Sequence, residues 1–584
     1  MPPAPRGPHP APPMLSMAQP PATRRSPSSS PRSIPRSTCV KPAVMYTGIA
    51  LYASCLLFWW LAMRGDANRL QVSRWSSSVL PHTNSEFYAE ASSSSNSVAD
   101  TLLETFARGI GASTPELLKL HRRHHIPDFK CVGWRQTEGC SPDGPRDAGR
   151  DMNCGGVVNA GASGYCLLRD EATGQEVQAM RLSCNSLRNR TTFKCSQAVD
   201  FVRVAPQVDA IIAAKRRELE EEGGAQLRGS EKNGTMEAAR GVVMVVYPKL
   251  LHSVHATVRL LRGYGCKLPV ELWFLESEMG ATPLDSSRVL QSLVKDYGPV
   301  TLRGITDDLV VGFTSKVYAL ANSGLDQLLF LDADNAPVRD PTYLFDSPEF
   351  LKTGSVFWPD FWTPANTIFN IKAESLIWEL VGTPFVDMFE QESGQLLIDR
   401  RQTAVALQVA QFLAMREPRH LERLRLSYGD KDLFRLAWLK TNTPFHMIVT
   451  PPAAAGMVRD KQYCGMTMVQ HDTRGEVIFL HRNGKKLSGE ENFERDHTWG
   501  QLQTFVFPER LASVDADPDK RYAFVKKHFK VDIFQGGRQF VKTRMCYGDR
   551  FLKSKHFQLT PWENLPWHNI EDTLLDYARD ASQL

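Results

Sequence analysis

The strongest constraint on the fold is a regular alternation that begins at Gly241. Short, continuous apolar runs alternate with longer segments whose apolar residues have the spacing of a helix. The run Val242–Tyr247 is rich in β-branched residues and is bounded by glycine and proline, which is typical of a buried strand. Further strands are expected at 270–275 and 328–331, and helices at 250–264, 286–297 and 313–321. Strands that alternate with helices predict a doubly wound α/β domain, in which ligands bind beyond the carboxyl ends of the strands.

Two acidic residues follow one of these runs directly, in the order Asp332-Ala333-Asp334. Two carboxylates one residue apart at a strand end can bind one hard divalent ion, and such an ion can neutralise a diphosphate leaving group. The same spacing recurs at Asp515 and Asp517, but no apolar run precedes that pair, so a turn is expected there. We therefore predict that Asp332 and Asp334 bind a metal ion.

His481 also follows an apolar run, VIFL, and stands before Lys485 and Lys486. An imidazole at a strand end can complete the shell begun by the two aspartates, because Mn²⁺ accepts mixed oxygen and nitrogen ligands. The alternative is a surface histidine in a basic loop. Both lysines are candidates to bind phosphate as point charges, as is Lys316 on the predicted helix before the aspartates.

Five stretches then resemble a known family. They are LLFLDADNAPVRDPTYLFDSPEF (328–350), TGSVFWPDFW (353–362), ESGQLLIDRRQTAVALQVA (392–410), YGDKDLFRLAWL (428–439) and MVQHDTRGEVIFLHRNGKK (468–486). Over roughly residues 238–490 the chain resembles the fungal-type Golgi alpha-mannosyltransferases, which add alpha-1,2- or alpha-1,3-linked mannose. His481 and Lys486 also resemble the His-x-x-Gly-x-Lys element of glycogenin-like transferases, in which the histidine binds metal.

The resemblance implies a Rossmann-like nucleotide-diphospho-sugar transferase fold. It implies GDP-mannose as donor, Mn²⁺ (or Mg²⁺) as cofactor and a glycan or glycoprotein as acceptor. It also implies retention of anomeric configuration. A same-face attack needs no obligatory enzyme nucleophile, so we propose no nucleophilic residue. There are two alternatives. One is a transferase that uses a UDP-sugar, and the other is an inactive glycan-binding or scaffold protein of the same fold.

Other motifs offer sugar-binding or catalytic groups. Ser393-Gly394-Gln395 precedes the run LLID, where the glycine would let backbone approach a ligand and Gln395 would bind sugar hydroxyls; a plain turn is the alternative. Asp430 and Asp432 are candidates for a base or for binding sugar hydroxyls, although one of them can simply be a helix N-cap. Trp358, Asp360 and Trp362 combine aromatic faces with a carboxylate, which suits a sugar, and core packing is the competing interpretation.

The N-terminal part predicts a membrane anchor. Residues 1–42 are rich in proline and contain no acid, which is typical of a disordered tail. Residues 43–63 are uncharged and long enough to span about 30 Å of hydrocarbon. A signal peptide or a buried core helix fits less well. The basic residues before the span place the tail in the cytosol, so a single-pass type II Golgi membrane protein with a lumenal catalytic domain is expected.

The lumenal part divides into several predicted segments. A stem at 64–130 precedes a cysteine-rich module at 131–200, whose six cysteines predict up to three disulfides of undetermined pairing, with a zinc site as the alternative. A helical linker at 201–238, a catalytic domain at 239–490 and a C-terminal extension at 491–584 follow. Asn189 and Asn233 begin glycosylation sequons.

The net charge of +5 comes from the N-terminal region. Residues 1–64 contain seven basic residues and no acids, so the rest of the chain is slightly acidic. The basic excess therefore reports membrane topology, and we expect no nucleic-acid partner. The sequence leaves the oligomeric state open.

Overall fold

The structure is a computed structural model that describes residues 127–229, 238–484, 486–489, 497–540 and 545–584. The predicted tail, the membrane span at 43–63, nearly all of the stem, Asn233 and Lys485 lie outside the described residues. Within the described ranges, no helix is both long and apolar enough to cross a membrane.

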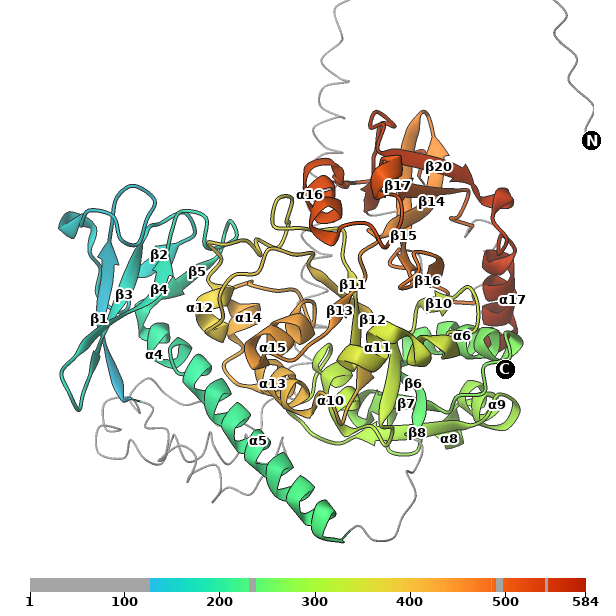
Figure 1. Cartoon of the computed structure of the whole chain (residues 1–584), viewed down its shortest axis with the longest axis horizontal. Helices are drawn as coiled ribbons and strands as arrows, with labels where there is room; N and C mark the ends of the chain where they lie inside the picture. The colour runs from blue at the N-terminus through green and yellow to red at the C-terminus, as the bar shows by residue number, and fades with distance from the viewer. Residues whose placement is uncertain (1–126, 230–237, 485, 490–496, 541–544) are drawn as a thin grey trace, which may run out of the picture. The chain divides into compact units, whose positions relative to one another are not determined.

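A seven-stranded mixed sheet forms the centre of the predicted catalytic domain (Figure 1). In spatial order its strands are β13 (His446–Met447), β11 (Ser355–Pro359), β12 (Gln391–Asp399), β9 (Gln327–Leu331), β6 (Arg240–Val245), β7 (Val270–Leu275) and β8 (Val300–Ile305). Strands β9, β6, β7 and β8 are parallel, whereas β12 runs antiparallel to β9. The predicted α/β class is therefore confirmed, with an antiparallel strand inserted beside β9.

Both faces of this sheet are covered, because successive residues of each strand point to opposite sides. Val242 and Met244 of β6 belong to one apolar core, and Val243 belongs to the other. The first core includes residues of α6 (Leu251–Gly263) and α9 (Arg288–Asp296). The second includes residues of α10 (Thr314–Asn322), α13 (Ala404–Met415) and α15 (Leu433–Thr441). The short helices are α7 (Glu276–Met279), α8 (Pro283–Ser286), α11 (Pro348–Thr353), α12 (Ile377–Val381) and α14 (His420–Arg423).

A second, antiparallel sheet joins distant parts of the chain. Its main path is β10 (Asn335–Pro337), β16 (Val477–His481), β15 (Gln462–His471), β14 (Ala453–Arg459), β17 (Gln501–Phe505) and β20 (Phe557–Pro561). Strands β18 (Asp532–Phe534) and β19 (Cys546–Gly548) join it through β15. Helix α16 (Pro518–His528) contributes Val525 to a core on this sheet, and α17 (Ile570–Ser582) packs against α6. The C-terminal residues thus share one sheet with strands of the predicted catalytic domain.

The cysteine-rich module consists of two small sheets. One contains β1 (Phe129–Gln136), β3 (Gly164–Asp170) and β4 (Glu176–Leu182), and the other contains β2 (Val157–Asn159) and β5 (Thr192–Lys194). The three predicted disulfides are confirmed, with the pairs Cys131–Cys154, Cys140–Cys184 and Cys166–Cys195. Because all six sulfurs form disulfides, the zinc interpretation is wrong. Helices α4 (Ala198–Phe201) and α5 (Val204–Gly229) lead to the catalytic domain.

Candidate functional site

The predicted metal-binding aspartates lie where β9 leaves the central sheet. Every residue of β9 is buried, and the chain turns sharply after Leu331. The Asp332 N–H donates to the Gly394 carbonyl at 2.9 Å, which joins this turn to β12. The Asp332 side chain remains 28% exposed, whereas that of Asp334 is buried. One carboxylate therefore faces the open side of the site and the other faces the protein.

The second sheet brings His481 to these aspartates. Strand β10 begins at Asn335, directly after the pair, and its register sets Asn335 opposite His481 of β16. His481 Nε2 lies 3.4 Å from Asp334 Oδ1 and 3.7 Å from Asp332 Oδ2. The three residues each offer a ligand atom within 4.8 Å of the others. Two carboxylates and one imidazole are a donor set that fits Mn²⁺.

Lys316 lies among acids beside this triad. Its Nζ is 3.1 Å from Asp332 Oδ1 and 2.8 Å from Asp430 Oδ2, and it donates to the Ser393 carbonyl at 2.8 Å. Burial by itself would lower the pKa of Lys316, but the charges of Asp332 and Asp430 raise it above its usual value. The ammonium is thus held charged and offsets the acids. Lys486 forms an ion pair with Asp334 and keeps a side chain that is 45% exposed.

Strand β12 supplies the wall against which His481 packs. A Cβ atom on Gly394 would lie 2.4 Å from His481 Nδ1, so only glycine lets the imidazole approach the strand. Glu392 Oε1 accepts the Gly394 N–H at 2.7 Å and lies 3.5 Å from His481 Nδ1. Sequence reasoning missed Glu392, although it stands two residues before the glycine in the quoted ESGQ stretch. The glycine is explained here by the histidine.

Gln395 lies beneath the triad and is fully buried. Its Oε1 accepts a hydrogen bond from Asn335 Nδ2 at 2.7 Å, and the same amide nitrogen donates to the Gly394 carbonyl at 2.8 Å. These bonds tie β12 to the first residue of β10. In this arrangement Gln395 supports the turn that contains Asp332 and Asp334, and it has no exposed surface for a sugar.

The two aspartates of the GDKD motif have different surroundings. Asp430 contacts Lys316, as described above. Asp432 is fully buried with φ +62°, and it accepts from the Gln391 N–H at 2.9 Å and from Arg435 Nε at 2.7 Å. Its other oxygen lies 2.6 Å from Lys431 Nζ. Asp432 makes no side-chain bond that caps the following helix. These contacts indicate that Asp432 organises the loop, and Asp430 is the aspartate nearer the triad.

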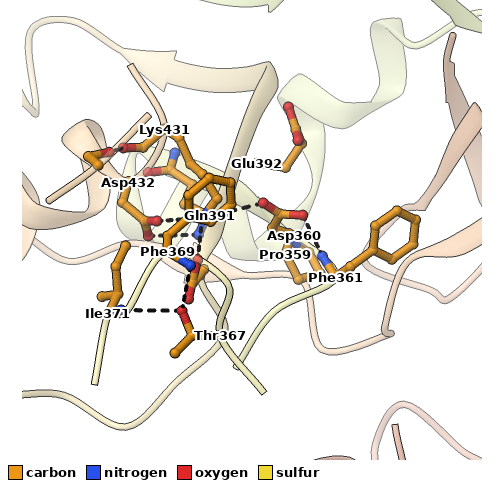
Figure 2. A network of polar contacts seen from close by, with 12 residues as sticks. Pro359, Asp360, Phe361, Thr367, Phe369, Ile371, Gln391, Glu392, Lys431 and Asp432 are labelled. Atoms are coloured by element: carbon orange, nitrogen blue, oxygen red, sulfur yellow. Dashed lines mark hydrogen bonds and ion pairs between the residues drawn. The ribbon is translucent and has the colours of Figure 1, made fainter. Parts of the chain in front are cut away.

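Lys431 is the centre of a buried ionic network (Figure 2). Its Nζ contacts Glu390 Oε2 at 2.5 Å, Asp432 Oδ2 at 2.6 Å and Asp360 Oδ2 at 3.3 Å. Burial raises the pKa of Asp360 to about 7, against the opposing effect of the Lys431 charge. Sequence reasoning considered only the acids of GDKD and missed Lys431 and Glu390. The signal was a lysine between two acids in an otherwise apolar setting.

The two tryptophans proposed for sugar binding lie in apolar cores. Trp358 is fully buried, and its indole N–H donates to the His471 carbonyl at 2.8 Å. Trp362 is 3% exposed and packs in a second cluster. Both positions agree with core packing, the competing interpretation of this motif.

The remaining predicted positions lie away from these contacts. The Ala516 N–H donates to the Ser513 carbonyl at 3.2 Å, which confirms a turn at the second aspartate pair, and Asp517 then caps the start of α16. Asn189 is exposed, so its glycosylation stays a prediction.

Part of the chain is similar to known mannosyltransferases. Residues 239–472 match the family model described as "Mannosyltransferase putative". The chain is 27% identical to Alpha-1,2-mannosyltransferase MNN24 of Candida albicans, over 58% of this chain and 55% of that protein. It is 24% identical to Alpha-1,2-mannosyltransferase MNN2 of Saccharomyces cerevisiae, over 40% of this chain and 45% of that protein. The chain thus spans about half the length of the curated relatives it matches.

Among solved structures, Core-mannan synthase A of Aspergillus fumigatus is 8% identical with a TM-score of 0.24, over 38% of this chain and 75% of that one. Over residues 239–472, which include Asp332 and Asp334 and end before His481, the chain is similar to this mannosyltransferase family.

Proposed function

We propose that this chain transfers mannose from GDP-mannose to a hydroxyl group of a glycan or glycoprotein, with Mn²⁺ as cofactor. The observation that carries the proposal is the Asp332, Asp334 and His481 triad, which lies at the carboxyl end of a buried strand. A divalent ion bound there would neutralise charge on the departing nucleoside diphosphate. Mn²⁺ is favoured over Mg²⁺ because one ligand is an imidazole nitrogen.

The chain's own residues would orient the site. Lys316 holds Asp332 and Asp430 in fixed positions, and Gly394 and Glu392 confine the His481 ring. Lys486 is the described lysine that combines contact with the triad and an exposed side chain, so we assign it to the diphosphate. Such preorganised charges stabilise a developing anion without reorganisation during the reaction.

We also propose a lumenal location for the catalytic domain in the Golgi, behind the anchor predicted at 43–63. Four disulfides in the described residues support this location, because disulfides persist in oxidising compartments.

Donor choice is tested with the purified full chain, Mn²⁺, and GDP-mannose, UDP-glucose or UDP-galactose, with nucleotide release and transfer to a mannose oligosaccharide measured in parallel. We expect turnover with GDP-mannose. Turnover with a UDP-sugar alone would replace the donor assignment. Oligosaccharide binding without turnover of any donor would favour the glycan-binding alternative.

The metal assignment predicts the effect of Asp332→Asn. Loss of one carboxylate ligand is expected to weaken Mn²⁺ binding and to lower turnover by about a hundredfold or more, since a bound metal stabilises the transition state by several kcal/mol. Electron paramagnetic resonance of free Mn²⁺ measures binding independently of activity. Asp515→Asn, in the exposed second pair, is the matched control. Unchanged Mn²⁺ affinity in Asp332→Asn would refute the assignment.

A further inference from the structure

Exposed aromatic rings lie next to the candidate site. Tyr428 is 62% exposed and Phe313 is 55% exposed, and their ring centroids are 5.9 Å apart. Phe369 is partly buried, with its ring centroid 6.2 Å from that of Tyr428. Large apolar side chains are seldom left in contact with water as a group, and such groups mark binding surfaces.

The same two segments build this surface and the inner ion pair. Phe313 directly precedes α10, which contributes Lys316, and Tyr428 directly precedes Gly429 and Asp430. Lys316 and Asp430 are joined at 2.8 Å inside the protein, while Phe313 and Tyr428 are in contact outside. The ion pairs of Lys316 with Asp430 and Asp332 therefore fix the position of the aromatic surface relative to the triad.

Gly429 allows this close packing. It has φ +58°, and a Cβ there would lie 2.8 Å from the Phe313 ring. Both its backbone conformation and the space beside it require glycine. A recess at this point is lined by Phe313, Gly429 and Asp430, together with the charged residues Arg419 and Glu422. The Phe313 ring, several aliphatic side chains and charged groups thus border one hollow.

Polar groups also border the aromatic surface on its inner side. The Lys431 ammonium lies 4.6 Å from the centroid of the Phe369 ring, and Figure 2 shows this ring beside the network that includes Asp360. The Arg188 guanidinium of the cysteine-rich module also lies near this ring, 5.4 Å from the same centroid. Asn370 Nδ2 donates to the Asn185 carbonyl at 2.9 Å, which fastens this loop to the module.

We propose that Tyr428, Phe313 and Phe369 form the acceptor subsite and that its occupant is a hexopyranose ring of the acceptor glycan. This inference rests on the proposed function. One face of a pyranose presents C–H groups that pack on aromatic rings, and its rim of hydroxyls needs polar partners. The surface offers both kinds of group, and its position beside Asp430 and the triad suits an acceptor whose hydroxyl must reach the donor sugar.

The test compares Tyr428→Ala and Phe313→Ala with the unmodified full chain, with α-linked mannobiose as acceptor. We expect the KM for mannobiose to rise about tenfold, as loss of an aromatic contact implies, while the KM for GDP-mannose stays within about twofold. Tyr428→Phe keeps the ring and should restore most of the affinity. Phe551→Ala removes an aromatic ring that is 47% exposed elsewhere and serves as control.

Saturation-transfer NMR of mannobiose with the same variants, without donor, separates this inference from the proposed function. Loss of saturation transfer in Tyr428→Ala, with retention in Phe551→Ala, supports the subsite even if GDP-mannose proves to be the wrong donor. If Tyr428→Ala and Phe551→Ala have the same KM for mannobiose and the same saturation transfer, the proposed subsite is wrong. An effect confined to glycoprotein acceptors, with mannobiose unaffected, would show that the surface binds polypeptide and would also overturn it.

Discussion

Asp360 shows how burial changes the chemistry of a single carboxyl group. Aromatic residues flank it in the sequence, yet both neighbouring tryptophans are core residues. Asp360 is itself 5% exposed, accepts the Phe361 N–H at 2.6 Å and lies beside Lys431. Lys431 is shared with Glu390 and Asp432, so the positive charge available to Asp360 does not offset the cost of removing it from water.

This environment predicts a pH dependence. Burial raises the pKa of Asp360 to about 7, whereas an unfolded aspartate titrates near 3.9. Between these values the folded chain binds more protons at this position than the unfolded chain, so the contribution of Asp360 to stability falls as pH rises from about 4 to about 7. The difference in Tm, Asp360→Asn minus the unmodified chain, should therefore increase by several degrees between pH 5 and pH 8. Calorimetry at both values measures this, with exposed Asp308→Asn as control. A constant Tm difference would contradict the prediction.

At the scale of elements, the loop before α15 carries two roles in adjacent residues. Asp430 points to Lys316 and the triad, while Asp432 holds the loop to β12 through Gln391. The two could not be distinguished from the sequence, because both are acids in the same short motif. Ion pairing and burial separate them, and those depend on β12 and α10.

Asp432→Asn tests the structural role. Asparagine tolerates positive φ, so the substitution removes the charge and leaves the backbone conformation accessible. Lys431 and Arg435 would then lose a buried partner, and we expect a loss of about 3–5 kcal/mol in the free energy of unfolding. Urea denaturation measures it, and Asp519→Asn at an exposed position should stay within about 0.5 kcal/mol of the unmodified chain. If Asp432→Asn changes the free energy of unfolding equally little, the structural role is wrong and Asp432 remains a candidate base.

Much of the element pattern could be predicted. The apolar runs at 242–247, 270–275 and 328–331 correspond to β6, β7 and β9, because their strands are buried on both faces. Strand β12 was seen only as a short run after Gly394, and its antiparallel pairing with β9 was not predicted. Local periodicity reports burial but carries no information on strand direction.

At the scale of the whole molecule, the triad depends on two sheets. The central sheet supplies Asp332 and Asp334, and the antiparallel sheet supplies His481. Residues from the C-terminal part complete the antiparallel sheet through β17 and β20. The Cys464–Cys546 disulfide joins β15, which pairs with β16 and His481, to β19.

Removal of this disulfide should destabilise the whole catalytic domain. The bond closes a loop with a sequence separation of 82 residues, and loss of a native disulfide typically costs about 2–5 kcal/mol. We expect the double variant Cys464→Ala/Cys546→Ala to have a lower Tm by calorimetry under non-reducing conditions. Cys266→Ala, at a buried free cysteine, is the matched control. A Tm loss no larger than that of the control would show that the bond contributes little.

The sequence alone determined the α/β class, the disulfide-rich module and the aspartate pair proposed to bind metal, because these follow from local periodicity, cysteine content and residues adjacent in the chain. The resemblance to a family likewise depended on motifs of residues that are adjacent in the chain. The tertiary structure alone decided the disulfide pairing, the contact of His481 with Gly394, the separation of Asp430 from Asp432 and the exposure of Tyr428 beside Phe313. Each of these depends on which distant segments exclude water from a side chain, and only the packed fold specifies that.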